Sequence, residues 1–317
     1  MKYSPQSLNE RIIRTTIDWS SAGLLLADML AGRFTYRSRD EWCARIESGE
    51  ITLNGKTVSP ETVLSLHDRI EYRPGDITEP AADLNYRIVA ESDSYLVIDK
   101  PGNLCMHPAG PFFKHTLWHL LCSRFGEIHF INRLDRETSG LLLAAKNPAT
   151  AAKFAKQRNV SAKTYQVIVH GDFPDTLEAD GFISFAGSIV RKKRRFTYEI
   201  PGTPPFENAF TQFVTLKRGS GFSLVRATLG TGRMHQIRAT MHSLGYPVAG
   251  DKLYGVNENF YLKQRSEELT TADREQLIFT RQALHSCELE FTDPADGREY
   301  HFESPLPPEL QKFTDQF

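Results

Sequence analysis

Within the first fifty residues, two segments repeat their hydrophobic positions with the period of an α-helix. This pattern runs through residues 20–31 and 39–48, and Gly49 stands where a glycine commonly ends a helix. The segment that follows contains Asn54-Gly55, a strong signal for a two-residue hairpin turn. The N-terminal part therefore predicts two helices followed by a small β-sheet.

A stretch rich in Pro, Gly and Ala over residues 74–82 interrupts this pattern. We place a domain boundary near residue 80, which predicts a small α/β domain over residues 1–80 and a larger domain over residues 81–317.

Strand-like runs outnumber helical runs beyond the boundary, and several arrive as hairpin pairs. This order favours an α+β fold with a mixed, largely antiparallel central sheet and flanking helices over a doubly wound sheet. The predicted strands cover residues 86–91, 94–100, 140–147, 163–171, 208–218, 222–229, 283–291 and 299–302, and the predicted helices cover 115–124, 148–159 and 233–244.

Composition is that of an ordinary globular protein, because 40% of the 317 residues are hydrophobic and 24% are charged. The N-terminus lacks the apolar core of a signal peptide, and no run of 18 apolar residues predicts a membrane span. We therefore expect a cytoplasmic protein that does not contact a membrane. The four cysteines are scattered without a C-x-x-C pair, so we expect reduced thiols.

Net charge is only -1, which argues against coating of nucleic acid by bulk electrostatics. Positive charge is nevertheless concentrated in the middle of the chain, where residues 131–240 hold 17 Lys and Arg against 8 Asp and Glu. A polyanionic ligand would be attracted there. Five consecutive cations in this region predict either a solvated loop or strand edge or a phosphate clamp: Arg191, Lys192, Lys193, Arg194 and Arg195.

The segment I-N-R-L-D-R-E-T-S-G-L-L-L, residues 131–143, places Asp135 between Arg133 and Arg136 just before a predicted buried strand. A solvated ion pair and a catalytic aspartate both explain this segment taken alone. A second segment, L-G-T-G-R-M-H-Q-I-R at residues 229–238, combines a tight turn with a group of hydrogen-bond donors.

Arginine is disfavoured near a helix N-terminus on dipole grounds, so we expect a ligand or a carboxylate partner for Arg233. A solvated basic helix start is the other interpretation. The remaining donors of this segment are His235, Gln236 and Arg238.

The two segments resemble H-R-L-D-x-x-T-S-G and T-G-R-x-H-Q-I-R, the signature motifs of the synthases that convert uridine to pseudouridine in ribosomal and transfer RNA. The resemblance continues through Y-P-V-A-G-D-K-L-Y-G, K-T-Y and A-L-H-S-C-E-L-E-F, and spans residues 85–305 in the family's order. It implies the pseudouridine synthase fold. More loosely, G-E-I-T-L-N-G-K and H-D-R-I resemble the small RNA-binding domain named after ribosomal small-subunit protein four.

The resemblance implies that Asp135 is the catalytic carboxylate, that Arg233 is its basic partner and that Tyr165 stacks on the uracil. It implies base flipping, with Arg133 filling the vacated stack. A structured ribosomal or transfer RNA is the expected partner, with no cofactor and no metal, and we expect a monomer. The other residues expected to contact RNA are Asn132, Arg136, His235, Gln236, Arg238 and the five cations at 191–195.

Asn132 stands where the family usually has His, which removes a chargeable group beside the motif but leaves Asp135 unaffected. An RNA-binding or ribosome-assembly factor without turnover is therefore an alternative. A hydrolase that uses Asp135 and His235 is a weaker one, because no nucleophile elbow or paired carboxylates accompany them. His115 and His119 have helical metal-binding spacing without an acidic ligand motif, which favours a structural role.

Overall fold

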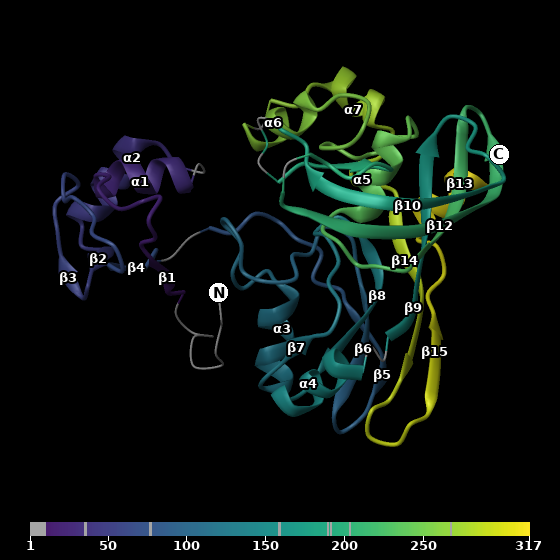
Figure 1. The fold of residues 1–317 in the computed structure, drawn as a ribbon, viewed down its shortest axis with the longest axis horizontal. Coiled ribbons are helices and arrows are strands. Elements are labelled where there is room, and N and C mark those ends of the chain that lie inside the picture. The colour runs from purple at the N-terminus through teal and green to yellow at the C-terminus, as the bar shows by residue number, and fades with distance from the viewer. Residues whose placement is uncertain are drawn as a thin grey trace. The chain divides into compact units, whose positions relative to one another are not determined.

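The computed structural model describes residues 11–34, 37–75, 78–157, 160–188, 190, 192–202, 204–266 and 268–317. The chain forms two compact units, drawn in Figure 1. The smaller unit contains the chain up to Ala81 together with His107–Glu127, and the larger unit contains Ala82–Met106 and Ile128–Phe317. No helix among the described residues is long and apolar enough to cross a membrane.

In the described residues of the smaller unit, α1 and α2 pack on a four-stranded antiparallel sheet with the strand order β1-β4-β2-β3. Ser38 caps the second helix. Gly49 follows the end of this helix with a φ of 79°, as the sequence predicts. Asn54 and Gly55 both have positive φ in the predicted hairpin turn. The elements are β1 (Ile13–Thr16), α1 (Leu26–Arg33), α2 (Arg39–Glu47), β2 (Ile51–Leu53), β3 (Lys56–Thr57), β4 (Arg69–Tyr72) and, later in the chain, α3 (Leu117–Phe125).

The larger unit is built on an 11-stranded sheet, which confirms the predicted α+β class (Figure 1). Its main path runs β11-β10-β12-β13-β9-β14-β8-β6-β5, with β15 beside β14 and β7 beside β8. The strands are β5 (Arg87–Glu91), β6 (Tyr95–Lys100), β7 (His129–Phe130), β8 (Ser139–Ala145), β9 (Val160–His170), β10 (Thr176–Phe185), β11 (Arg194–Thr197), β12 (Phe206–Gly219), β13 (Phe222–Leu229), β14 (Leu284–Thr292) and β15 (Glu299–Glu303).

Within the part of the chain that the structure describes, β8 and β14 form the one parallel pair of this sheet. The pair is short and joins His285 to Ser139 and Ser286 to Gly140. Gly140 has a φ of 107°, and a Cβ atom there would lie 2.1 Å from the Ser286 carbonyl oxygen. Glycine is therefore required where β14 meets β8, directly after the segment that contains Asp135.

Five helices accompany this sheet in the described part of the larger unit, and two of them pack through aromatic side chains. Phe154 packs edge-on against Tyr95 and Phe291, and Phe313 packs against Phe222 and Phe279. These contacts bury apolar surface on the sheet, the main source of stability for such helices. The helices are α4 (Pro148–Gln157), α5 (Gln236–Ser243), α6 (Asn259–Arg265), α7 (Thr271–Leu277) and α8 (Pro308–Thr314).

Candidate active site

Asp135 lies in the turn between β7 and β8, and its side chain is 30% exposed. The turn is closed by a hydrogen bond from the Thr138 N–H to the Asp135 carbonyl. Arg136, which follows Asp135 in the turn, is held by two hydrogen-bond donors. Its carbonyl accepts from the Leu104 N–H at 3.0 Å and from Lys100 Nζ at 3.1 Å. The backbone that carries the carboxylate is therefore fixed from one side, while the carboxylate itself reaches solvent.

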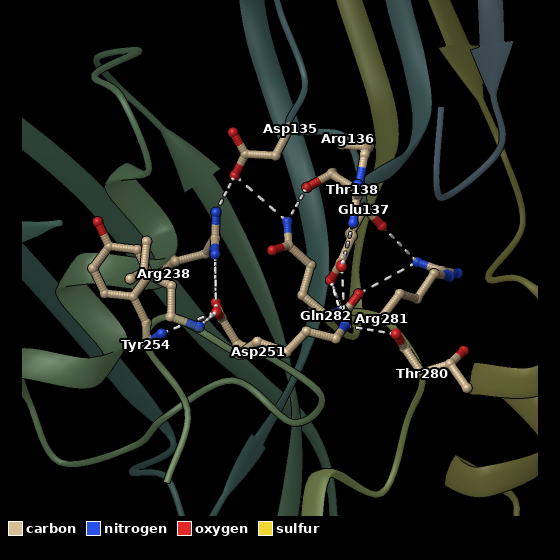
Figure 2. A network of polar contacts seen from close by, with 12 residues as sticks. Asp135, Arg136, Glu137, Thr138, Arg238, Asp251, Tyr254, Thr280, Arg281 and Gln282 are labelled. Atoms are coloured by element: carbon tan, nitrogen blue, oxygen red, sulfur yellow. Dashed lines mark hydrogen bonds and ion pairs between the residues drawn. The ribbon is translucent and has the colours of Figure 1, made fainter. Parts of the chain in front are cut away.

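Arg238, in the first turn of α5, binds the carboxylate directly (Figure 2). Its Nη1 lies 2.6 Å from Asp135 Oδ2, while Nε and Nη2 donate to Asp251 at 2.6 and 2.9 Å. Asp251 is fully buried and also accepts from the N–H groups of Leu253 and Tyr254. The Tyr254 ring covers the guanidinium at 4.9 Å. Asp251 and Tyr254 thus hold Arg238 in one orientation toward Asp135.

The family resemblance implied that Arg233 pairs with Asp135, but in the structure Arg233 pairs with a different carboxylate. Arg233 Nη1 lies 3.0 Å from Glu207, and its Nε donates to the Asn208 carbonyl. Arg233 does have the carboxylate partner that its position predicted, but that partner lies on β12. Arg238, expected to contact RNA, is the cation at Asp135 instead, because the helix begins at Gln236 and turns Arg238 toward the β7–β8 turn.

These charges decide the protonation state of the site. Burial raises the pKa of Asp135, but the charge of Arg238, the proximity of His235 and hydrogen bonds from Arg238 and Gln282 lower it more, so its pKa lies below the ordinary value. Asp135 is consequently ionised at neutral pH. Burial lowers the pKa of His235 to about 4, so its imidazole is neutral under the same conditions.

Gln282 approaches the same oxygen of Asp135 from the start of β14. Its Nε2 lies 3.5 Å from Asp135 Oδ2 and 2.5 Å from the Thr138 hydroxyl, as Figure 2 shows. Lys252 Nζ donates to both oxygens of Glu137 at 2.9 Å and to the Thr280 carbonyl. These bonds join the β7–β8 turn to the strand that pairs with β8. No role was expected from the sequence for Gln282, Lys252 or Asp251, although Asp251 and Lys252 lie inside a segment that resembles the family.

Lys100 is a further residue near Asp135 to which the sequence gave no role. Its side chain is 0% exposed, and Nζ donates to the carbonyls of Pro101, Leu104 and Arg136 at 2.8 to 3.1 Å. Burial lowers its pKa to about 7. Lys100 thus connects the end of β6 to the turn that bears Asp135. The available signal was a lysine that directly follows the apolar run Tyr95–Ile98 and Asp99 in the predicted strand.

Tyr165 lies on β9 beside β14, with a side chain that is 6% exposed. Burial raises its pKa above the ordinary value and the negative charge of Asp135 acts in the same direction, so the phenol is neutral. The structure therefore places Tyr165 within the electrostatic influence of Asp135.

The predicted RNA contacts near the two motifs divide into internal and accessible side chains. Asn132 Oδ1 accepts from the Leu143 N–H at 2.8 Å and supports β8. Gln236 is buried, and its amide links Thr231 and Arg233 to β12 through Phe210 and Thr211. The structure thus assigns both amides to internal support. Arg133 is exposed, and Arg136 is partly buried beside Glu137.

The run of cations is similarly divided. Arg191 lies outside the described residues. Lys193 is buried and bonds Glu258 at 2.7 Å, and Arg194 begins the edge strand β11 with its guanidinium 4.1 Å from the Phe185 ring. Lys192 and Arg195 are exposed. A strand edge thus explains part of the run, and two exposed cations remain for a phosphate contact.

The described residues contain no group of three or more His, Cys, Asp or Glu side chains that could hold a metal ion. His115 Nδ1 lies 3.0 Å from the Pro80 carbonyl, and His119 packs against Phe113, which are structural contacts. All four cysteines are free thiols.

Comparisons with known proteins identify similar sequences and a similar solved structure. Residues 94–243 match the family model described as RNA pseudouridylate synthase. The chain is 30% identical to ribosomal large subunit pseudouridine synthase D of Nitrosomonas europaea, over 95% of this chain and 87% of that protein. It is also 30% identical to the synthase D of Pseudomonas aeruginosa, over 92% and 91%. The solved structure of human RNA pseudouridylate synthase domain containing 1 is similar with a TM-score of 0.56 and 26% identity, over 74% of this chain and 89% of that one.

Proposed function

Since this chain belongs to the family of RNA pseudouridine synthases, isomerases that convert uridine in RNA into pseudouridine, we propose that it modifies a specific uridine of large-subunit ribosomal RNA, with Asp135 as the catalytic carboxylate. The relatives named for the large ribosomal subunit support this choice of RNA over transfer RNA. A cytoplasmic location and a monomeric state are part of the same proposal.

The observation that carries the proposal is the asymmetric environment of the Asp135 carboxylate. Arg238 and Gln282 both approach Oδ2, whereas within the described residues no hydrogen bond reaches Oδ1. The side chain is ionised and 30% exposed. One oxygen is therefore fixed by the protein, and the other is left to act on a nucleotide that enters from solvent.

The reaction breaks the bond between uracil N1 and the ribose C1' and forms a bond between C5 and C1', while C5 loses a proton and N1 gains one. No redox step is involved. Asp135 supplies the anion that acts on the nucleotide, and Arg238 keeps it ionised where a carboxylic acid would otherwise hold its proton. Tyr165, with a neutral phenol on β9, is proposed to contact the uracil.

The target uridine has to leave its stack to reach Asp135, at a cost of a few kcal/mol. Arg133 is proposed to occupy the vacated position, because it is exposed two residues before Asp135. A planar guanidinium stacks on bases and binds phosphates, so it can contact both the exposed bases and the backbone of an RNA helix from which a base has been flipped.

The test is to map pseudouridines in ribosomal and transfer RNA of cells that lack the protein, and to restore either the wild type or Asp135→Asn. We expect one or more large-subunit sites to be lost and to return only with the wild type. Asp135→Asn should still bind the RNA fragment with an affinity close to that of the wild type. Turnover by the variant would refute the role of Asp135, and an unchanged ribosomal map would refute the choice of RNA.

A further inference from the structure

His235 has an unusual backbone conformation immediately before α5. Its φ and ψ are 58° and 22°, in the left-handed region that residues other than glycine seldom adopt. The surrounding structure retains this conformation, and the imidazole lies between Tyr254 and Asp135. Backbone strain of this kind persists where the surrounding structure holds a side chain in a fixed position, as is common at functional sites.

The hydrogen bonds of Tyr254 identify which nitrogen of His235 carries the proton. The buried Tyr254 hydroxyl oxygen accepts from the Arg194 N–H at 2.7 Å and lies 2.9 Å from His235 Nδ1. Among the described residues, Nδ1 is the available acceptor for the Tyr254 proton. If Nδ1 carried a hydrogen instead, the buried hydroxyl hydrogen would lack a partner, which is costly.

The surroundings of the other ring nitrogen, Nε2, indicate the same position for the proton. His235 Nε2 lies 3.7 Å from Asp135 Oδ1. A lone pair on Nε2 would face an anion, whereas an N–H at that position is attracted to it. The neutral His235 therefore has its proton on Nε2, directed toward the oxygen of Asp135 that Arg238 and Gln282 leave free.

We infer that His235 is a positioning residue, held as the Nε2–H tautomer by Tyr254, which orients and stabilises the reactive Oδ1 of Asp135. The inference rests on the proposed role of Asp135. At 3.7 Å the two atoms are not hydrogen-bonded, and a movement of about 0.7 Å would bring them within ordinary hydrogen-bond distance. Binding of a nucleotide that draws the β7–β8 turn toward α5 would close this gap. Charged and titratable groups around the imidazole are Asp135, Arg194, Arg238, Asp251 and Tyr254.

The tautomer is measured by long-range proton–nitrogen NMR of the full-length protein labelled with ¹⁵N-histidine, with His235→Asn used to assign the signal. Asn tolerates the left-handed conformation and is too short to reach Asp135. We expect the Nε2–H tautomer in the wild type, and its loss or mixing with the other tautomer in Tyr254→Phe. An Nδ1–H tautomer in the wild type would overturn the inference without touching the role of Asp135.

The functional arm is single-turnover pseudouridine formation as a function of pH. His235→Asn and Tyr254→Phe should lower the rate about 10- to 100-fold with unchanged RNA affinity. They should also move the acid limb to higher pH, because Asp135 loses a donor that favours its ionised form. His242→Asn is the matched control, since His242 contacts the Tyr254 ring from the same helix and has no contact with Asp135. A wild-type rate and acid limb in His235→Asn, with Asp135→Asn inactive, would reject this inference alone.

Discussion

Nη1 of Arg238 lies 2.6 Å from Oδ2 of Asp135, and the rest of the same guanidinium binds the buried Asp251. One cation therefore serves two carboxylates, of which one is internal and one faces the substrate side. Arg233, five residues earlier, pairs with Glu207 at a half-exposed position.

The two arginines should consequently respond differently to replacement by lysine. Arg238→Lys should destabilise the protein by about 3 kcal/mol, since an ammonium cannot reproduce the paired bonds to Asp251 and reach Asp135. It should also lower turnover at least about 100-fold. Arg233→Lys, the matched variant, should change stability by less than about 1 kcal/mol. Urea unfolding and a turnover assay measure both variants. A larger loss of turnover in Arg233→Lys than in Arg238→Lys would instead support Arg233 as the partner of Asp135.

The lowered pKa of Lys100 predicts that the stability of the protein depends on pH. Its pKa is about 7 in the folded protein and near 10.4 when unfolded, so between these values the unfolded chain binds more protons. The free energy of unfolding of the wild type should therefore rise with pH, relative to Lys100→Met, by up to about 4 kcal/mol from about pH 7 to about pH 10. Below about pH 7 the difference should be flat. Urea unfolding across this range measures it, and a constant difference would contradict a depressed pKa.

Lys192 and Arg195 are the two described cations of the basic run whose side chains are exposed. Neutralising both to Ala should weaken RNA binding and reduce the slope of log affinity against log salt by roughly 1.5, if each contacts a phosphate. Lys153→Ala with Lys156→Ala removes the same charge from exposed positions on α4. An equal effect of the two double variants would indicate long-range attraction, and an unchanged slope in the first would reject the clamp.

Gly140 tests the junction between β8 and β14. Gly140→Ala should destabilise the protein by more than about 3 kcal/mol, because its Cβ would clash with the Ser286 backbone at an unfavourable φ. Gly297→Ala also has a positive φ but nothing within 4 Å of the added Cβ, so its cost should be only about 1 to 2 kcal/mol. Thermal or urea unfolding of both variants separates steric overlap from backbone preference.

Much of the larger unit was predictable because its strands are apolar and separated by clear turn signals. The hairpin of β12 and β13 turns through Ser220 and Gly221, both with positive φ, close to where the sequence placed it. β10 and the edge strand β11 were not predicted, since Asp180 and Arg195 interrupt their apolar patterns. Pattern alone does not distinguish such an edge strand from a loop.

The resemblance of its segment to a family motif drew attention to Asp135, but the arginine expected beside it was not the one that binds it. Arg238 is 103 residues away in sequence, and its direction depends on the left-handed conformation of His235, which delays the start of α5. Neither the separation nor that conformation leaves a local pattern in the sequence.

The parallel junction of β8 and β14 also constrains when the protein becomes active during synthesis. Asp135 precedes β8, Arg238 follows β13 and Gln282 precedes β14, so the groups around the carboxylate come from segments up to 147 residues apart. Contacts of such separation form late, because a long loop of chain has to close first. A nascent chain in which β14 has not yet been synthesised lacks the strand that pairs with β8. The arrangement of groups around Asp135 is thus complete only after β14 has been synthesised and has paired with β8.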